Sequence, residues 1–254
     1  MSQLLIAIGA ILAITTGLFV NGGARAADTP EKQVISYTVT RDENGWVNVN
    51  GKSYPPGIDG NTVISTPDGD FVVGDNRGMT REQIIASHKM SLEAEAKIVH
   101  EVPLCPVIID GVEYKPEQIH LFDGQSLTFT AGKDGLEYAF TREADLWRFI
   151  DEQANSNSSS GMSVLTTDYF SVFYYDALLQ GVKLECRYDC PLRVMPSGWN
   201  NVISSMEVTT ESYCCLWDDP DYEGDSRVFA PGAVEQWLTY YGWNDRASSI
   251  LHVE

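Results

Sequence analysis

Two copies of one heptapeptide lie in the last quarter of the chain, Trp199-Asn200-Asn201-Val202-Ile203-Ser204-Ser205 and Trp243-Asn244-Asp245-Arg246-Ala247-Ser248-Ser249. Each copy has a tryptophan, two residues that are Asn or Asp, two variable residues and a pair of serines. Asn, Asp and Ser favour bends because their short side chains hydrogen-bond the neighbouring backbone. The two copies therefore predict two bends of the same kind near the C-terminus.

The repeat continues upstream of both copies. Tyr174 is followed by six residues and Gly181, and Trp217 is followed by six residues and Gly224, so both landmarks recur after 43 positions. We interpret each aromatic as a strand residue and each glycine as a position whose backbone conformation other residues resist. A repeat of this length is one supersecondary unit that buries its apolar face against its copy.

The second copy indicates how one unit is built. Residues 218–224 are dense in turn-forming residues, and Val228 and Phe229 then resume an apolar strand pattern. Residues 250–253 read as a final strand. Several short strands with turns at this spacing predict a β-sandwich.

These features resemble the βγ-crystallin superfamily in its microbial, calcium-binding form. That family builds one domain from two Greek-key motifs, each with an aromatic, six residues, a glycine and a later serine. Its microbial members carry the signature Asn/Asp-Asn/Asp-x-x-Ser/Thr-Ser, which is complete here at 200–205 and at 244–249. The resemblance covers residues 169–254, about the last third of the chain, and implies a Greek-key β-sandwich of two motifs.

The resemblance also implies two calcium ions, each shared between the two motifs. In that family the fifth signature position supplies a hydroxyl, the second a side-chain oxygen and the third a backbone carbonyl. The residue after the strand aromatic supplies a further carbonyl. Calcium takes about 6–8 oxygen ligands of these kinds. The signature and turn positions carried over in this way are Asn200, Asn201, Val202, Ser204, Asn244, Asp245, Arg246, Ser248, Tyr175 and Asp218.

The two expected ions are not equivalent. Asp245 brings a formal charge where Asn201 brings none, so we expect unequal affinities. The alternative is that the hexapeptides only form bends, since Asn and Ser satisfy turns without a metal. Both copies keep oxygen-bearing residues at all four signature positions, which favours calcium.

The N-terminus has the pattern of a secretory signal peptide. An apolar run from Leu4 to Val20 precedes Ala24-Arg25-Ala26, and this order predicts cleavage after residue 26. No Lys or Arg precedes the run, which departs from the usual pattern. An uncleaved anchor is the alternative, because the run approaches the length of a membrane span. We expect export with cleavage, and no stable membrane span afterwards.

The chain is acidic, with 36 Asp and Glu residues against 17 Lys and Arg residues and a net charge of −19. Such a charge argues against a nucleic-acid partner, whose phosphates the protein would repel. It favours the accumulation of cations, although solubility alone would also account for much of it.

Cysteine usage fits an oxidising compartment. One pair falls in each motif, Cys186 with Cys190 and Cys214 with Cys215, whereas Cys105 stands apart. Adjacent strand residues point to opposite faces, so Cys214 and Cys215 should not share one site. The four cysteines of the motifs are the disulfide candidates, and three pairings are open to them.

The rest of the chain predicts further regions. Residues 27–104 have an uncertain fold, with a helix expected over 80–100 that Thr80 and Gln83 would cap, and a turn at Gly74-Asp75-Asn76-Arg77. Residues 105–153 predict a small α+β module, with a hairpin at Asp110-Gly111 and a helix over 141–150 capped by Thr141. A Ser/Asn-rich linker is expected at 154–166, and the crystallin-like domain at 167–254. The fold class is therefore multi-domain and mainly β.

Among possible functions, a secreted, non-enzymatic calcium-binding protein fits best, with calcium stabilising the Greek-key domain. No Ser-His-Asp arrangement, zinc-protease motif or phosphate loop stands out in the sequence. A secreted proteinase inhibitor or killer-toxin-like protein on the same fold is one alternative. A cell-envelope structural or adhesion protein is another, with an unknown partner bound through residues 27–153. Either a periplasmic or an envelope location would also agree with export.

Overall fold

The computed structural model describes residues 34–155 and 169–254, apart from 58, 67–68 and 88–89. Residues 33–254 form one compact unit. The expected signal peptide lies outside the described residues. The expected linker lies outside them too, except that residues 154 and 155 still belong to a helix.

The last third of the chain forms two four-stranded motifs that exchange strands. The eight strands are β10 (Phe170–Asp176), β11 (Gln180–Arg187), β12 (Leu192–Val194), β13 (Ser205–Glu207), β14 (Tyr213–Asp219), β15 (Glu223–Phe229), β16 (Val234–Glu235) and β17 (Ser249–Val253). One sheet contains the order β16-β13-β10-β11, and the other contains β12-β17-β14-β15. The third strand of each motif therefore belongs to the sheet of the other motif, and neither motif can form its sheet alone.

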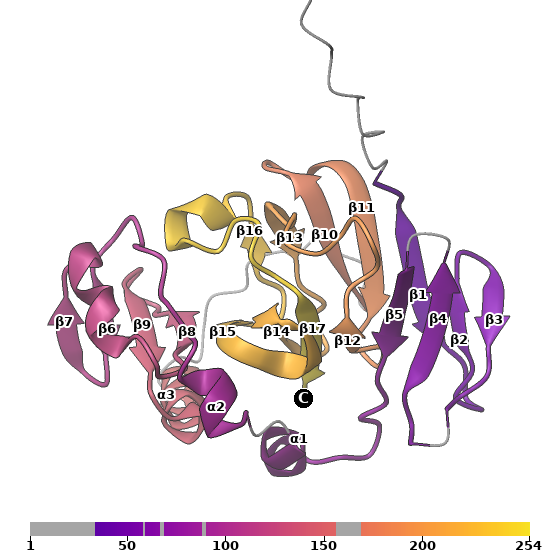
Figure 1. Ribbon diagram of the computed structural model, residues 1–254, viewed down its shortest axis with the longest axis horizontal. Helices are drawn as coiled ribbons and strands as arrows, with labels where there is room; N and C mark the ends of the chain where they lie inside the picture. Colours follow the sequence, from indigo (N-terminus) through magenta and orange to yellow (C-terminus); the bar gives the residue numbers. More distant parts are fainter. Residues whose placement is uncertain (1–33, 58, 67–68, 88–89, 156–168) are drawn as a thin grey trace, which may run out of the picture. The chain divides into compact units, whose positions relative to one another are not determined.

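The earlier part of the chain extends both sheets. Its strands are β1 (Tyr37–Arg41), β2 (Val47–Val49), β3 (Lys52–Tyr54), β4 (Thr62–Thr66), β5 (Gly69–Val73), β6 (Val107–Ile109), β7 (Val112–Tyr114), β8 (Thr128–Ala131) and β9 (Glu137–Phe140). β1 pairs in parallel with β11, β5 pairs antiparallel with β12, and β8 pairs in parallel with β15 (Figure 1). Sheets of seven and ten strands result, and the region expected as a separate module at 105–153 shares its sheet with the crystallin-like part.

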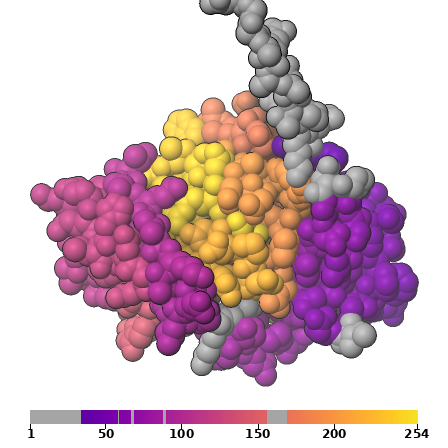
Figure 2. Space-filling model, viewed as in Figure 1, coloured from indigo at the N-terminus to yellow at the C-terminus, as the bar shows by residue number. Residues whose placement is uncertain are grey.

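The crystallin-like strands consequently lie between two N-terminal additions. In the ten-stranded sheet, β4 and β5 stand on one side of them and the strands β6 to β9 on the other. Figure 2 shows the same arrangement, with the orange and yellow residues between the violet and the magenta ones. The edges of β11, β12 and β15 that a lone Greek-key domain would leave bare are thus paired.

The helices are α1 (Arg81–Ser87), α2 (Leu92–Glu95) and α3 (Glu143–Asn155), and the 3₁₀ turns are η1 (Pro116–Phe122), η2 (Pro220–Tyr222) and η3 (Leu238–Tyr241). The single helix expected over 80–100 is wrong, because Ser91 accepts a hydrogen bond from the Ala94 N–H and starts a second helix. The capping box of Thr80 and Gln83 is present. No helix in the described part of the chain is both long and apolar enough to cross a membrane.

The helix predicted at 141–150 exists, but its expected cap is wrong. Thr141 donates hydrogen bonds from its N–H and its hydroxyl to the Asp110 carboxylate instead. Asp110 and Gly111 both have positive φ, at 48° and 85°, as the predicted hairpin between β6 and β7 requires. The Thr141 side chain therefore ties the start of α3 to that hairpin.

Two apolar clusters lie on the two faces of the ten-stranded sheet. The larger cluster fills the space between the sheets and includes Leu216 and Trp243. The smaller one packs Trp217 and Leu251 against side chains of α1 and α3. Neighbouring residues of β14 alternate between the clusters, as a pleated strand demands.

All five cysteines are free thiols in this structure, so the expected disulfide is not confirmed. Cys214 belongs to the larger apolar cluster and Cys215 to the smaller, as their adjacent positions on one strand predict. Cys186 and Cys190 are also fully buried in the larger cluster. Burial raises the pKa of these four thiols, so they pack as small hydrophobic side chains.

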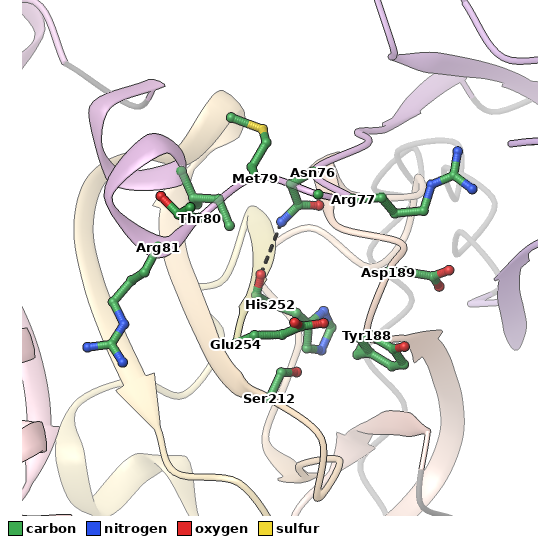
Figure 3. Close-up of a pocket in the computed structure, with 12 residues that line it drawn as sticks. Asn76, Arg77, Met79, Thr80, Arg81, Tyr188, Asp189, Ser212, His252 and Glu254 are labelled. Carbon is green, nitrogen blue, oxygen red and sulfur yellow. Dashed lines mark hydrogen bonds between the residues drawn. The ribbon is translucent and has the colours of Figure 1, made fainter.

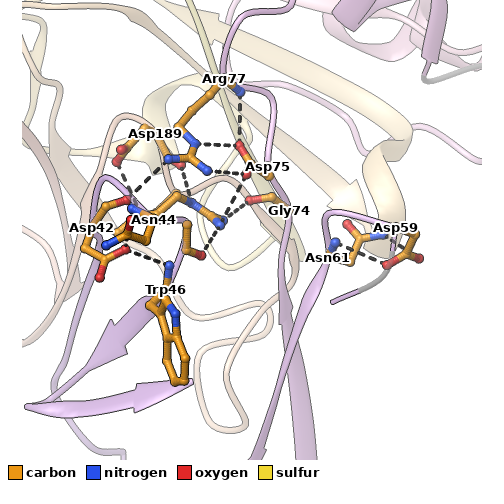
Figure 4. A network of polar contacts seen from close by, with 12 residues as sticks. Asp42, Asn44, Trp46, Asp59, Asn61, Gly74, Asp75, Arg77 and Asp189 are labelled. Carbon is orange, nitrogen blue, oxygen red and sulfur yellow. Dashed lines mark hydrogen bonds and ion pairs between the residues drawn. The ribbon is translucent and has the colours of Figure 1, made fainter. Parts of the chain in front are cut away.

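Buried polar groups fasten the N-terminal additions to the domain. The Arg41 side chain is fully buried and donates to the backbone carbonyls of Gly45, Gly74 and Asp189. Arg77 pairs with Asp75 in the same region (Figure 4). Three segments distant in sequence therefore meet around one guanidinium group.

Candidate metal centre

Both signature hexapeptides lie in the connections between strands, one before β13 and the other before β17. The second residue of each has a left-handed backbone, with φ of 56° at Asn201 and 58° at Asp245. Asn and Asp tolerate this conformation better than most other non-glycine residues. The residue types at these positions are therefore required by the bend itself, whether or not a metal binds.

Backbone hydrogen bonds hold the two hexapeptides against each other. The Asn201 N–H donates to the carbonyl of Ala247 at 2.9 Å, and the Asp245 N–H donates to the carbonyl of Ile203 at 3.1 Å. Each bond runs from the second position of one copy to the fourth position of the other. The two copies are thus related by approximate twofold symmetry.

Side chains cross between the hexapeptides in the same way. The Ser204 hydroxyl lies 3.4 Å from the Asp245 carboxylate, and the Ser248 hydroxyl lies 3.0 Å from the Asn201 amide oxygen. We name these two clusters the Ser204 centre and the Ser248 centre. In each, the fifth residue of one copy meets the second residue of the other, so neither centre is complete within a single motif.

The turn positions carried over from the family resemblance lie at strand irregularities beside these centres. The register of β10 with β11 shifts at Tyr175, and the register of β14 with β15 shifts at Asp218. A bulged residue is left out of the ladder, which leaves its backbone groups open to other partners. The preceding residues, Tyr174 and Trp217, accept hydrogen bonds from the N–H groups of Ser204 and Ser248. Each bulge therefore lies next to the serine of its own motif.

The sixth signature position has a structural role in both copies. The Ser205 hydroxyl donates to the Asp176 carbonyl at 2.6 Å, and the Ser249 hydroxyl donates to the Asp219 carbonyl at 2.8 Å. Gly224, with φ of 81°, lies so close to the Asp218 carboxylate that any side chain there would collide with it. These contacts fix the turn after each aromatic strand and hold the bulge in place.

The carboxylate of Asp245 has no cationic partner among the described residues. Partial burial raises its pKa, and the Ser204 hydroxyl opposes that shift by hydrogen-bonding the charged form. A carboxylate with no counterion beside a hydroxyl supplies oxygen donors of the kind that a hard cation prefers. The Ser204 centre therefore carries negative charge that nothing in the described chain neutralises.

The Ser248 centre differs because a guanidinium group lies beside it. Arg246 donates to Asp218 at 2.6 Å and to Asp225 at 3.2 Å, and it stacks on the Trp243 ring. Burial raises the pKa of Asp218 to about 6, although Arg246 opposes the shift. The Asn201 amide that meets Ser248 is neutral, so this centre lacks the formal charge that Asp245 gives the other.

Two residues of this network, Asp225 and His100, are not predicted from the sequence. Asp225 is fully buried and binds Arg246, the His100 ring at 2.8 Å and the Leu127 N–H at 2.8 Å. The family resemblance predicts only a backbone carbonyl ligand at Arg246, and the sequence predicts no role for His100. Because His100 is 125 residues from Asp225, no local spacing could have joined them.

Asn200 and Asn244 occupy the first signature position of the two copies. Asn200 is exposed and Asn244 half-buried, and they lie one residue before the crossing side chains. Within the described residues no three His, Cys, Asp or Glu side chains form a metal-binding group. The donors brought together here are hydroxyl, amide, carboxylate and carbonyl oxygens, which fit calcium and do not fit zinc or copper.

No protein-family model and no curated protein matches the sequence. Solved structures similar to it include a βγ-crystallin from Ciona intestinalis (22% identity, TM-score 0.29, covering 33% of this chain and 98% of that one) and spherulin 3a from Physarum polycephalum (23%, 0.29, 37% and 90%). A βγ-crystallin from an archaeon is also similar (15%, 0.30, 34% and 100%). The exchange of β12 and β16 between sheets and the two in-register motifs give residues 169–254 the fold of a βγ-crystallin domain.

Proposed function

We propose that this protein is an exported, non-enzymatic calcium-binding protein whose Greek-key domain binds two calcium ions and is stabilised by them. The observation that carries the proposal is the crossing of the two hexapeptides, Ser204 with Asp245 and Ser248 with Asn201. Oxygen atoms from both motifs meet there in a form that either motif alone lacks. Export rests on the signal-like N-terminal sequence.

In the Ser204 centre the proposed ligands are the Ser204 hydroxyl, the Asp245 carboxylate and the backbone carbonyls of Val202 and Tyr175. In the Ser248 centre they are the Ser248 hydroxyl, the Asn201 amide oxygen and the backbone carbonyls of Arg246 and Asp218. Four protein oxygens leave room for water, since calcium takes about 6–8 ligands. Each ion would then connect the two motifs, and unfolding would destroy both centres.

The structure adds a second reason for unequal affinities. Asp245 has no counterion among the described residues, whereas the Arg246 guanidinium lies beside the other centre and pairs with Asp218. Arg246 lowers the negative charge around the Ser248 centre, whereas Asp245 keeps its own, and this difference acts on a divalent ion even with the high effective dielectric near a protein surface. We therefore assign the tighter site to the Ser204 centre.

Calorimetric calcium titration of the chain that begins at Ala27 tests the proposal. The isolated segment 165–254 is unsuitable, because removing β1, β5 and β8 would uncover three strand edges. We expect two binding events of unequal affinity, the tighter lost in Ser204→Ala and the weaker lost in Ser248→Ala. Ser53→Ala, on the exposed strand β3, is the matched control and should bind as wild type. No heat at millimolar calcium would refute the calcium proposal.

A further inference from the structure

A second candidate site lies apart from both centres, in a cavity of about 380 Å³. The segment joining β5 to α1, the loop between β11 and β12, and the end of β17 line it (Figure 3). One water occupies about 30 Å³ in the liquid, whereas small-molecule pockets begin at roughly 300 Å³. The cavity therefore has the size of a site for a small organic ligand, and its lining includes Asn76 and Arg77 of the Gly-Asp-Asn-Arg turn, which the proposed function leaves unexplained.

Two buried polar atoms on its wall have no hydrogen-bond partner among the residues that the structure describes. They are the Ser212 hydroxyl oxygen and His252 Nδ1, in side chains that are 1% and 3% exposed. Leaving a buried polar group without a partner costs roughly 1–3 kcal/mol. Both residues line the same cavity, so one occupant could satisfy both (Figure 3).

The contacts of the His252 ring determine what kind of occupant fits. Its Nε2 lies 2.9 Å from the Ser171 hydroxyl, which also accepts the Thr209 N–H. Burial lowers the pKa of His252 to about 4, so the ring is neutral at pH 7 and has one donor and one acceptor nitrogen. A ring whose Nε2–H donates to the Ser171 hydroxyl has Nδ1 as its acceptor, and a cation in the cavity favours this tautomer.

The charges around the cavity favour a cation. Three charged pairs are already formed within the protein, namely Arg77 with Asp75, Arg81 with Asp151, and Asp189 with Arg187. The Glu254 carboxylate lines the cavity and makes no ion pair within the described residues. The whole chain also carries a net charge of −19, which raises the local concentration of cations.

We propose that this cavity binds a small organic primary ammonium ion through His252 Nδ1, the Ser212 hydroxyl and the Glu254 carboxylate. A primary ammonium has three N–H donors and no acceptor, which matches three acceptors on one cavity wall. The alkyl part would lie against Met79 and Ile84, the apolar residues of the segment that closes the cavity. A free amine and the side chain of a lysine share this chemistry.

Three probes of equal chain length separate this chemistry from non-specific occupation: n-butylammonium, n-butanol and n-butyltrimethylammonium. Titrated by ligand-observed NMR into the chain that begins at Ala27, only n-butylammonium should bind saturably, at least tenfold more tightly than the other two. The alcohol lacks the charge and the quaternary ion lacks the N–H donors. A short peptide with one lysine shows whether a lysine side chain also enters or only a free amine does.

Variants assign the binding to this cavity. Glu254→Gln and Ser212→Ala should each weaken n-butylammonium binding at least threefold, and Glu254 is exposed, so its substitution leaves the fold intact. Ser226→Ala is the control, because Ser226 also has a buried hydroxyl that no described residue hydrogen-bonds, but it lies outside the cavity. Equal binding of all three probes, unchanged binding by Glu254→Gln, or no saturable binding up to about 50 mM would overturn the proposal and leave water as the occupant.

Discussion

The Ser204 and Ser248 centres share one backbone and differ in charge. In both, the serine N–H donates to the carbonyl before a bulge, and the second residue of the other copy adopts a left-handed conformation. The Ser204 centre has the free carboxylate of Asp245, whereas the Ser248 centre has the amide of Asn201 and the Arg246 guanidinium nearby.

Two equivalent backbones therefore do not make two equivalent sites. The backbone bonds that place the donors are equivalent because both copies have the same bend-forming residues. Metal affinity also depends on charges that are not ligands, and position three of the signature, Val202 in one copy and Arg246 in the other, is free to vary them. Four substitutions test this comparison, in decreasing order of expected effect.

Arg246→Met should have the largest effect, on the calcium-free protein. It leaves the half-buried Asp218 and the fully buried Asp225 carboxylates close together without the guanidinium, and removing one partner of a buried pair costs about 3–5 kcal/mol. Urea unfolding in EDTA measures the loss. Val202→Met at the equivalent position is the control and should cost less than about 1.5 kcal/mol. If the two variants lose equal free energy of unfolding, the charge difference between the centres does not affect the stability of the calcium-free protein.

Ser248→Arg should remove the calcium stabilisation that depends on the Ser248 centre. An ion present at a hundredfold excess over its Kd adds about 2.7 kcal/mol when it binds only the folded chain. The substitution replaces the hydroxyl ligand with a long cation that repels the ion. Melting of wild type and variant, each with EDTA and with calcium, measures the effect. If calcium raises both melting temperatures equally, Ser248 is not a ligand.

A pH dependence should distinguish the Ser248 centre next. Asp218 has a pKa of about 6 in the folded chain against an ordinary value of 3.8, so the folded chain binds more protons between these values. Its contribution to stability is therefore present below about pH 4 and is lost as the pH rises through 6. Calcium-free Asp218→Asn should lack this part of the fall. Asp219→Asn, next to it and exposed, should keep the wild-type profile.

Asp245→Asn should have the smallest of these effects, a tenfold weakening of the tighter site that corresponds to about 1.4 kcal/mol. The change keeps the side-chain shape and the left-handed backbone but removes the charge. Asn201→Asp is the reciprocal variant and should strengthen the weaker site. Calorimetric calcium titration of both variants measures the affinities of the two sites. An unchanged affinity of the tighter site in Asp245→Asn would exclude this carboxylate as a ligand.

The parts of the fold that the sequence predicts are those with local causes. The bends at Asn201 and Asp245 and the hairpin at Asp110-Gly111 depend on residues that tolerate positive φ, and each such residue is visible in the sequence. The repeat spacing predicts two equivalent motifs for the same reason. The calcium ligands inferred from it stay a prediction, but the structure brings the four crossing side chains together.

The parts that could not be predicted depend on long-range pairing. Nothing in the sequence of β1 specifies β11 as its neighbour, because any strand edge offers the same backbone groups. The break between α1 and α2 is not predicted, because the helical pattern of residues 80–100 continues across it. The contact of His100 with Asp225 likewise follows from the docking of a loop and not from a motif.

The pairing of β1 with β11 also has a consequence for the order of folding. Tyr37 pairs with Leu184 and Val73 pairs with Leu192, so strands made first need partners that are made more than a hundred residues later. Closing such long loops costs entropy before any contact repays it, and chains rich in distant pairings fold slowly. β1 and β5 therefore cannot pair with β11 and β12 until those strands have been synthesised. A chain that must cross a membrane unfolded would gain time from this delay, and its fold would be completed from the C-terminal end.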